Sequence, residues 1–417
     1  MTFSAPRLIV RTREIPAVED LLPFTSPHDP LVWMRRGEGM SGLGITYGLV
    51  AAAGADATWL SERWTEIAAA AEVDDDVQLP GTGLLAFGAL TFDRGSSHRS
   101  ILTVPGVVVG RRGGRSWVTT IHDAAGGRAS APHETPYGPH WAGAVGPGEQ
   151  TAAGYMDSVR AGLRAIADGD VGKVVLARDL RGTVPVGSDL RRLARALSQD
   201  YPDTWTFAVD GLIGASPETL VTVRGGTVTA RVLAGTTSRG ADADADVAAS
   251  AALATSAKDL DEHEFAVQSV LASLRPHTRA LVAAEAPFTL KLPNVWHLAT
   301  DVEGELGGTA SALDLVHALH PTAAVAGTPT DAAIDLIRRL EPFDRGRYAG
   351  PVGWIDAAGD GEWAIALRCA QFEVDDGGSS DIPVTAYAGA GIVAGSDPES
   401  ELIETRVKFR PIVDALA

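Results

Sequence analysis

Residues 384–408 read VTAYAGAGIVAGSDPESELIETRVK, and this stretch decides how the rest of the chain is interpreted. Thr385 and Tyr387 alternate with small or apolar neighbours, as residues on a strand do. Asp397 precedes Pro398, and this pair is typical of a helix N-cap followed by proline at the first helical position. The stretch therefore predicts a strand, a short connection and a helix.

The predicted connection is rich in glycine. Glycine lets the backbone turn tightly and come close to a ligand, so we expect a glycine-rich turn here. The glycines are Gly389, Gly391 and Gly395. A dinucleotide-binding turn would need a further strand and an acidic residue about 20 positions on. Only a helix follows, so this interpretation is disfavoured, and backbone N–H groups that receive a ligand carboxylate fit better.

The predicted helix carries charges on one face. Glu401, Glu404 and Lys408 are spaced three and four residues apart and so share that face. Two interpretations remain open from the helix alone. The face is either a solvated charged surface or part of a site for an anionic ligand bound through a metal.

The overall composition excludes several classes of function. The net charge of −18 argues against nonspecific binding to nucleic acid or to anionic membranes, and no apolar run reaches the length of a membrane span. Cys369 is the single cysteine, which excludes an internal disulfide and suits a reducing cytoplasm. We therefore expect a cytoplasmic protein without a signal peptide, and we expect it to be a monomer.

Lysine is rare in this chain, although basic residues are not. Lys and Arg together number 35, and the lysines are Lys173, Lys258, Lys291 and Lys408. Arginine does not release its proton in a protein, whereas a buried lysine can and so can act as a base. Each lysine is therefore a candidate for a chemical role, with chance placement as the alternative.

The chain divides by pattern into three parts. Residues 1–122 mix apolar strands with one helix and predict a scaffold subdomain, and the Gly- and Pro-rich residues 123–150 predict a linker. Residues 151–417 alternate clear helices and strands and predict one compact catalytic region. The acidic run 241–247 lacks the glycine and the final glutamate of a calcium loop, so we expect an ordinary acidic loop there.

Two helices carry similar acidic pairs. Asp259 and Glu262 are three residues apart on a helix that begins at Ser256, as are Glu401 and Glu404 on the last helix. Two such faces brought together would offer oxygen ligands to a hard cation, and Mg²⁺ fits because it takes few carboxylates and keeps positions for substrate oxygens. The sequence therefore predicts Mg²⁺ as the cofactor if the faces meet.

From about residue 151 to the C-terminus the chain resembles the chorismate-binding enzymes, which include isochorismate, salicylate, anthranilate and aminodeoxychorismate synthases. Many segments, in the family's order, carry the resemblance. They are KVVLAR (173–178), ASPETL (215–220), LAGT (233–236), KDLDEHE (258–264), WHLATDVEG (296–304), LHPTAAVAG (319–327), LEPFDRGRYAGPVGW (340–354), GEWAIALRCA (361–370) and AGAGIVAGSDPESELIETRVK (388–408).

The resemblance implies an α+β fold with large antiparallel sheets packed centrally, helices outside and the active site in a cleft. Three positions distinguish the activities within the family. Lys173 is typical of members that use water, Ala234 replaces a nucleophilic lysine, and Ala324 replaces the threonine of members that eliminate pyruvate. Together they imply Mg²⁺-dependent conversion of chorismate to isochorismate, in a pathway to menaquinone, a siderophore or another product.

The resemblance also implies roles for individual residues. Lys173 would be the base that activates water, and Glu218 the acid that protonates the leaving hydroxyl. The metal ligands would be Glu262 and Glu404, with Asp259 and Glu401 as further ligands. The residues expected to contact the substrate are Gly235, His297, Ala324, Tyr348, Arg368, Gly389 and Lys408.

Two alternatives accompany this hypothesis. A salicylate synthase would form isochorismate and then eliminate pyruvate, and its products would distinguish it. A non-catalytic relative that only binds chorismate would lack Lys173 or Glu218, and both residues are present.

Overall fold

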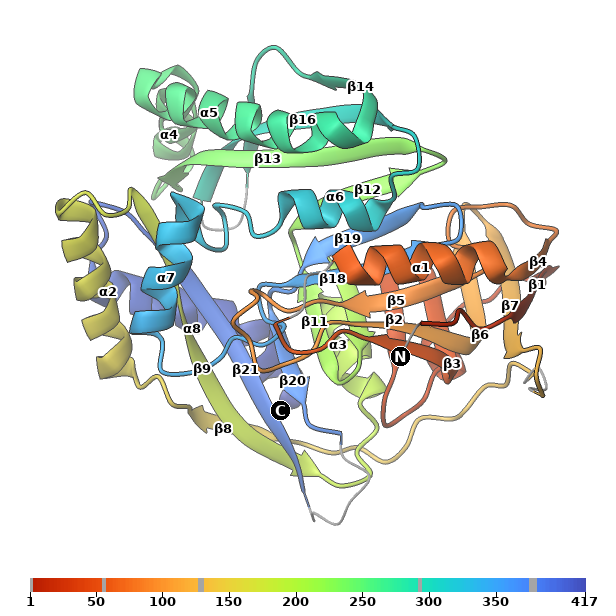
Figure 1. Cartoon of the computed structure of the whole chain (residues 1–417). Helices are drawn as coiled ribbons and strands as arrows, with labels where there is room; N and C mark the ends of the chain where they lie inside the picture. Colours follow the sequence, from red (N-terminus) through yellow and green to blue (C-terminus); the bar gives the residue numbers. More distant parts are fainter. Residues whose placement is uncertain (1–2, 55–57, 127–130, 292–294, 375–380) are drawn as a thin grey trace. The chain divides into compact units, whose positions relative to one another are not determined.

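The computed structural model describes residues 3–54, 58–126, 131–291, 295–374 and 381–417 (Figure 1). Within these ranges it leaves out the side chains of Thr236, Ser238, Lys258, Glu262 and Val295. The chain forms two compact units. The first comprises Met1–Glu218, Pro321–Ala357 and Trp363–Ala417, and the second comprises Thr219–His320 and Ala358–Glu362.

The first unit is built on a long antiparallel sheet. Its helices are α1 (Thr58–Ala70), α2 (Ala152–Ala167), α3 (Arg191–Asp200), α7 (Thr330–Leu340) and α8 (Pro398–Leu416), with a 3₁₀ turn at Leu22–Phe24. Its strands before the second unit are β1 (Leu8–Ile15), β2 (Leu31–Arg35), β3 (Glu38–Val50), β4 (Glu72–Asp75), β5 (Leu85–Ala89), β6 (Ile101–Arg112), β7 (Arg115–Asp123), β8 (Ala144–Pro147), β9 (Lys173–Pro185), β10 (Trp205–Val209) and β11 (Leu212–Ser216). Its later strands are β17 (Gly327–Thr328), β18 (Pro351–Asp356), β20 (Cys369–Phe372) and β21 (Asp381–Ile392), and β19 (Gly361–Ile365) begins in the second unit.

Strand pairing in this unit connects the two ends of the chain. The order runs β4–β1–β7–β6–β3–β2–β10–β11–β20–β21–β9–β8, and each of these pairs is antiparallel except β1 with β4. The strands β9 and β21 pair along nearly their whole lengths, from Asp381 opposite Pro185 to Ile392 opposite Val174, while Lys173 at the start of β9 lies opposite Thr328 of β17. Figure 1 shows them as long neighbouring strands, with α8 along them.

The helices of the first unit cover the β9–β21 part of the sheet with apolar side chains. Leu193 and Leu197 of α3 and Phe409 and Ile412 of α8 join a buried cluster with strand residues such as Ala386. Helices α2 and α7 pack on β9. This packing fixes the strands that carry Lys173 and the glycines of the opening stretch, since burial of apolar surface is the main stabilising contribution.

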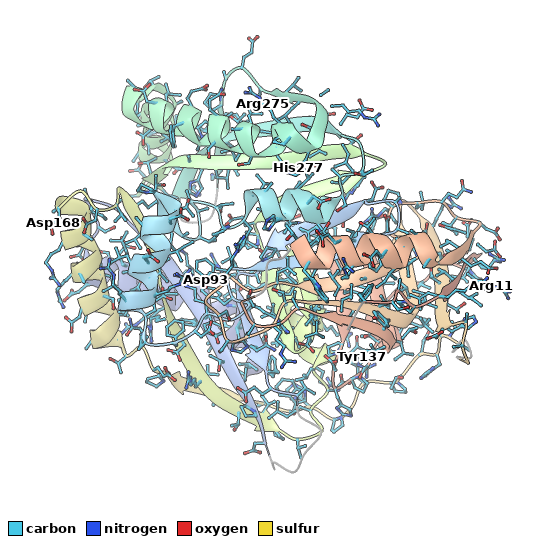
Figure 2. All side chains as sticks on the ribbon, in the orientation of Figure 1. Arg11, Asp93, Tyr137, Asp168, Arg275 and His277 are labelled. Carbon is cyan, nitrogen blue, oxygen red and sulfur yellow. The ribbon has the colours of Figure 1, made fainter. Side chains whose placement is uncertain are left out.

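The second unit has its own sheet and helices. Its strands are β12 (Thr219–Arg224), β13 (Thr227–Ser238), β14 (Thr278–Ala283), β15 (Phe288–Lys291) and β16 (Val295–Leu306). Its helices are α4 (Ala243–Thr255), α5 (Ala257–Leu274) and α6 (Ala312–Leu319), with a 3₁₀ turn at Arg275–His277, two residues that Figure 2 labels. The central pair is β13 with β16, and α4 and α5 both pack on it.

The structure corrects two expectations about loops. Gly389 and Gly391 lie inside β21, paired with β9 and without positive φ, rather than in a turn. Residues 241–247 do not form an acidic loop but enter α4, where Asp242 accepts a hydrogen bond from Ala245 N and Asp244 lies in the first turn. Carboxylates are favourable there because they compensate the unpaired N–H groups of the helix start.

The compact units do not follow the predicted boundaries at residues 122 and 150. The segment 1–122 shares the first unit with β9, β21 and α8 because its strand β2 pairs with β10. In the described part of the chain, no helix is long and apolar enough to cross a membrane.

Candidate active site

Lys173 begins β9 and its side chain extends across the neighbouring strand. A Cβ atom at position 391 would lie 3.1 Å from Cε of Lys173 and 3.8 Å from its Nζ. Any residue larger than glycine would therefore displace the lysine. The glycine of β21 gives Lys173 the space to lie over the strand, which is a different function from the tight turn that the sequence indicated.

Glu218 follows β11, and its backbone is held on both sides. Its N–H donates to Oγ of Ser216 at 3.2 Å, and its carbonyl oxygen accepts from the N–H of Ile365 at 3.0 Å. Burial raises the pKa of the Glu218 carboxyl, and the positive charges of Lys173, Lys408 and Arg368 oppose that rise. The structure thus brings the predicted acid together with the predicted base and two predicted substrate cations.

Arg368 lies between β19 and β20 with an unusual backbone conformation. Its φ of 49° is in the left-handed region, which is rare for residues other than glycine and is often found at functional sites. Its carbonyl oxygen accepts from the N–H of Ala215 on β11 at 3.1 Å. Burial lowers the pKa of the guanidinium, while Tyr348, Glu404 and Glu218 favour its charge. Arg368 is therefore a cation among acidic and phenolic groups in the same cluster.

Tyr348 is a further member of this cluster. It is buried and stacks on Tyr387 of β21, with ring centres 5.1 Å apart and planes 14° apart. A Cβ atom at position 389 would lie 3.1 Å from its hydroxyl oxygen. Gly389 therefore makes room for a phenol, as Gly391 makes room for a lysine. Burial raises the pKa of the Tyr348 hydroxyl, which stays a hydrogen-bond donor.

Lys408 connects α8 to the same strand. Its Nζ donates to the carbonyl oxygen of Gly389 at 2.8 Å and lies 2.6 Å from a carboxylate oxygen of Glu404. The charged helix face is therefore not merely solvated, because its lysine points to the strand over which Lys173 and Tyr348 lie. The backbone of β21 and the helix α8 together form one wall of the candidate site.

Glu401 and Glu404 share the α8 face and suit a cation. Burial raises the pKa of Glu401, and the negative charge of Glu404 adds to the rise. A divalent ion bound there would offset the repulsion that Glu401 experiences from Glu404. Among the side chains that the structure describes, no three His, Cys, Asp or Glu form a metal-ligand group.

The other predicted acidic ligands belong to the second unit. Asp259 lies in the first turn of α5, whose N-cap is Ser256. The side chain of Glu262 lies outside the described residues. Gly235 has φ +75° at a register shift of β13, and a Cβ there would lie 3.3 Å from Cβ of Asp259. His297 pairs with Thr236 on the neighbouring strand. Gly235, Asp259 and His297 thus lie around one bulge.

Ala324 lies in the loop that enters β17. It is exposed, and the N–H groups of the next two residues, Val325 and Ala326, donate to the carbonyl oxygen of Thr322 at 3.2 and 3.0 Å. The N–H of Val175 on β9 donates to the carbonyl oxygen of Ala326 at 2.8 Å. The loop is therefore attached to the strand that begins with Lys173.

Sequence reasoning missed three buried residues near this cluster. Tyr155 of α2 donates to the carbonyl oxygen of Leu176 at 3.4 Å, and both Glu401 and Glu404 act on its pKa, which burial raises. Glu341 and Arg345 form a buried ion pair. Both lie in the segment LEPFDRGRYAG, so the resemblance marked the segment but gave these two residues no role.

The chain is similar to known proteins over most of its length. It is 44% identical over 274 residues to isochorismate synthase DhbC of Bacillus subtilis, which covers 63% of this chain and 67% of that protein. It is 38% identical over 271 residues to isochorismate synthase EntC of Escherichia coli K12, covering 64% of this chain and 67% of that protein.

The fold is shared with a solved structure as well. MenF, the menaquinone-specific isochorismate synthase from Escherichia coli, superposes with a TM-score of 0.75 at 25% identity, covering 98% of this chain and 95% of that one. The expected α+β class, with its large antiparallel sheet, is thereby confirmed. Residues 129–417 match the family model described as chorismate binding enzyme, and the chain belongs to that family.

Proposed function

We propose that this protein is an isochorismate synthase, which adds water at C2 of chorismate and removes the C4 hydroxyl while the ring double bonds shift. The proposal rests mainly on Glu218. Burial raises the pKa of its carboxyl, and the positive charge of Lys173 acts on the same carboxyl. A protonated acid and a lysine base near one substrate are what this exchange of water needs. The relatives named isochorismate synthase support the same activity.

The proton transfers follow from the two side chains. A neutral Lys173 would take a proton from the attacking water, and a protonated Glu218 would give a proton to the departing hydroxyl, so that one water enters and one leaves. Afterwards Lys173 holds a proton and Glu218 is ionised, and both groups are reset by proton exchange. The reaction is therefore balanced without an oxidant or reductant and is reversible.

The cations and the phenol would orient the substrate. Arg368 and Lys408 offer positive charge to a carboxylate, and the hydroxyl of Tyr348 offers a hydrogen bond beside Gly389. The residues that would hold Mg²⁺ are Glu262 and Glu404, with Asp259 and Glu401 as further ligands, and a bound ion would supply positive charge to a substrate carboxylate. The like-charged α8 carboxylates support this part of the proposal.

One experiment tests the activity and its alternative. The purified protein is incubated with chorismate and Mg²⁺, and the products are separated and compared with those of a heat-inactivated sample. Isochorismate is expected as the only new product. Salicylate together with pyruvate would instead identify a salicylate synthase, and unchanged chorismate that nevertheless binds would identify a non-catalytic relative.

A further inference from the structure

Glu341 and Arg345 form an ion pair inside the first unit. Nε and Nη2 of Arg345 donate to the two carboxylate oxygens of Glu341 at 2.8 and 2.5 Å. The side chains are 1% and 3% exposed, so water does not reach the charges. A buried pair of this kind gives little net stability, because removing both charges from water offsets most of their attraction. Its presence therefore needs another explanation.

The pair binds the backbone of two segments at once. Arg345 donates to the carbonyl oxygens of Val175 at 2.8 Å and Val325 at 3.0 Å. Glu341 accepts from the N–H of Ala177 at 2.8 Å. Val175 and Ala177 follow Lys173 on β9, and Val325 follows Ala324 in the loop. One ion pair thus connects the strand of the predicted base to the loop of a predicted substrate contact.

The turn that carries the pair also carries Tyr348. The N–H of Tyr348 donates to the carbonyl oxygen of Arg345 at 2.9 Å, and the Arg345 guanidinium lies 5.9 Å from the Tyr348 ring centre. The phenol beside Gly389 is therefore attached to the same turn. Three predicted site residues from separate parts of the sequence are thus attached to Arg345: Lys173 through β9, Ala324 through its loop, and Tyr348 through the turn.

We propose that the Glu341–Arg345 pair is the positioning element that holds Lys173, the loop of residues 321–328 and Tyr348 in one fixed arrangement. The proposal rests on the proposed function, since the arrangement matters through the reaction at Lys173. Arg345 is a positioning residue because its hydrogen bonds go to backbone carbonyl oxygens and Glu341, and its guanidinium packs on the rings of Phe92 and Tyr348 at 4.3 and 5.9 Å. Its planar guanidinium reaches four acceptors in two directions, which a lysine ammonium cannot reproduce.

The chain offers a matched control in the same unit. Arg191 is fully buried, donates to both carboxylate oxygens of Asp189 at 2.8 and 2.7 Å, and binds the carbonyl oxygens of Thr135 and Pro136 at 2.9 Å. It lies 5.0 Å from the ring centre of Tyr137, which Figure 2 labels. Arg191 therefore has the same bonding pattern but holds no predicted site residue.

The experiment compares Arg345→Met, Arg345→Lys and Glu341→Gln with Arg191→Lys. Hydrogen exchange is followed in peptides covering 172–178 and 321–328, and kcat and KM are measured with chorismate. In Arg345→Met both peptides should exchange faster, and kcat should fall about 10- to 100-fold through misplacement of the base while KM changes less than about threefold. Arg345→Lys should recover part of kcat, and Arg191→Lys should keep kcat near wild type.

Two results would overturn the proposal. One is wild-type exchange in both peptides of Arg345→Met. The other is a loss of kcat in Arg191→Lys that equals the loss in Arg345→Lys. If Arg345→Met does not fold, Arg345→Lys and Glu341→Gln decide by the same two measurements. If the wild-type protein forms no isochorismate, the proposed function fails, and hydrogen exchange alone still decides whether the pair holds these segments.

Discussion

The side chain of Lys173 lies across Gly391, so that a Cβ atom at position 391 would stand 3.1 Å from Cε of the lysine. The two residues are on adjacent antiparallel strands, β9 and β21. The atoms that would be crowded belong to the far end of a flexible side chain, so the backbone need not move. A methyl group at 391 would displace the lysine and leave the sheet intact.

We therefore expect Gly391→Ala to lower kcat about 3- to 10-fold, since the lysine must shift by a few tenths of an ångström and a misplacement of about 1 Å costs about 100-fold. The matched control is Gly395→Ala, because a Cβ at position 395 meets no atom within 4 Å. Steady-state kinetics with chorismate and thermal unfolding of both variants provide the measurement. Normal turnover in Gly391→Ala would show that the position of Lys173 over this strand is unimportant.

Lys173→Ala should remove the base itself. The expected loss in kcat is about 100- to 10,000-fold, the usual range for a general base, with little change in the unfolding temperature. Lys291→Ala is the control, since Lys291 is exposed and lies in β15 of the second unit. Turnover of Lys173→Ala within a few-fold of the control would refute the assignment of the base.

The sequence predicted the elements of this site better than their function. Alternating residues and the Asp397–Pro398 cap located β21 and α8 well, but glycine content alone does not distinguish a turn from a strand crossed by neighbouring side chains. The function of Gly391 depends on the position of β9 beside β21, which could not be predicted from the sequence. The left-handed backbone of Arg368 was equally invisible, because arginine, unlike glycine, gives no sign of this conformation.

Contacts between residues that are far apart in the sequence could not be predicted either, because they depend on which strands pair. The i, i+3 spacing of Glu401 and Glu404 follows from helical geometry and could be predicted. The charges of Lys173, Lys408 and Arg368 reach Glu218 only because distant strands pair in the sheet. Glu341 and Arg345 carried no local signal, since an acid and a base four residues apart usually form an exposed pair.

The pH dependence of stability should reveal the raised pKa of Glu218. Its folded pKa lies above the ordinary 4.5, so the folded protein binds this proton more tightly than the unfolded chain. The stabilising contribution is complete below the unfolded pKa and is lost as the pH rises through the folded pKa. Glu218→Gln cannot ionise and should not show this loss.

The difference in unfolding temperature, Glu218→Gln minus wild type, should therefore increase with pH above about 4.5 and then level off. Activity should follow the same group, since kcat needs the protonated acid and should fall on the alkaline side, while Glu218→Gln should be nearly inactive. A temperature difference that stays constant from acidic to neutral pH would mean that the carboxyl is not desolvated.

Removal of divalent metal should abolish turnover, and added Mg²⁺ should restore it. Glu404→Gln should raise the Mg²⁺ concentration needed for half-maximal activity by about 10-fold or more, as loss of metal-site groups commonly does. Glu399→Gln is the control, because Glu399 is exposed in the first turn of the same helix. Binding of Mg²⁺ measured by calorimetry gives a readout without turnover, and full activity in chelator would refute the metal role.

Ala324→Thr should add elimination of pyruvate, because threonine is typical at this position in relatives that perform that step. Salicylate and pyruvate together contain the same atoms as isochorismate, so the step needs no further reactant. The loop already lies against β9 through the bond from Val175 N to Ala326 O, so the new hydroxyl would be carried by a fixed backbone. A hydrogen bond contributes about 1 kcal/mol, which corresponds to a roughly fivefold rise in pyruvate release.

Ala323→Thr places the same hydroxyl on the exposed neighbouring residue and should release no more pyruvate than wild type. Equal pyruvate from both variants, measured with a coupled dehydrogenase, would show that position 324 does not control the elimination.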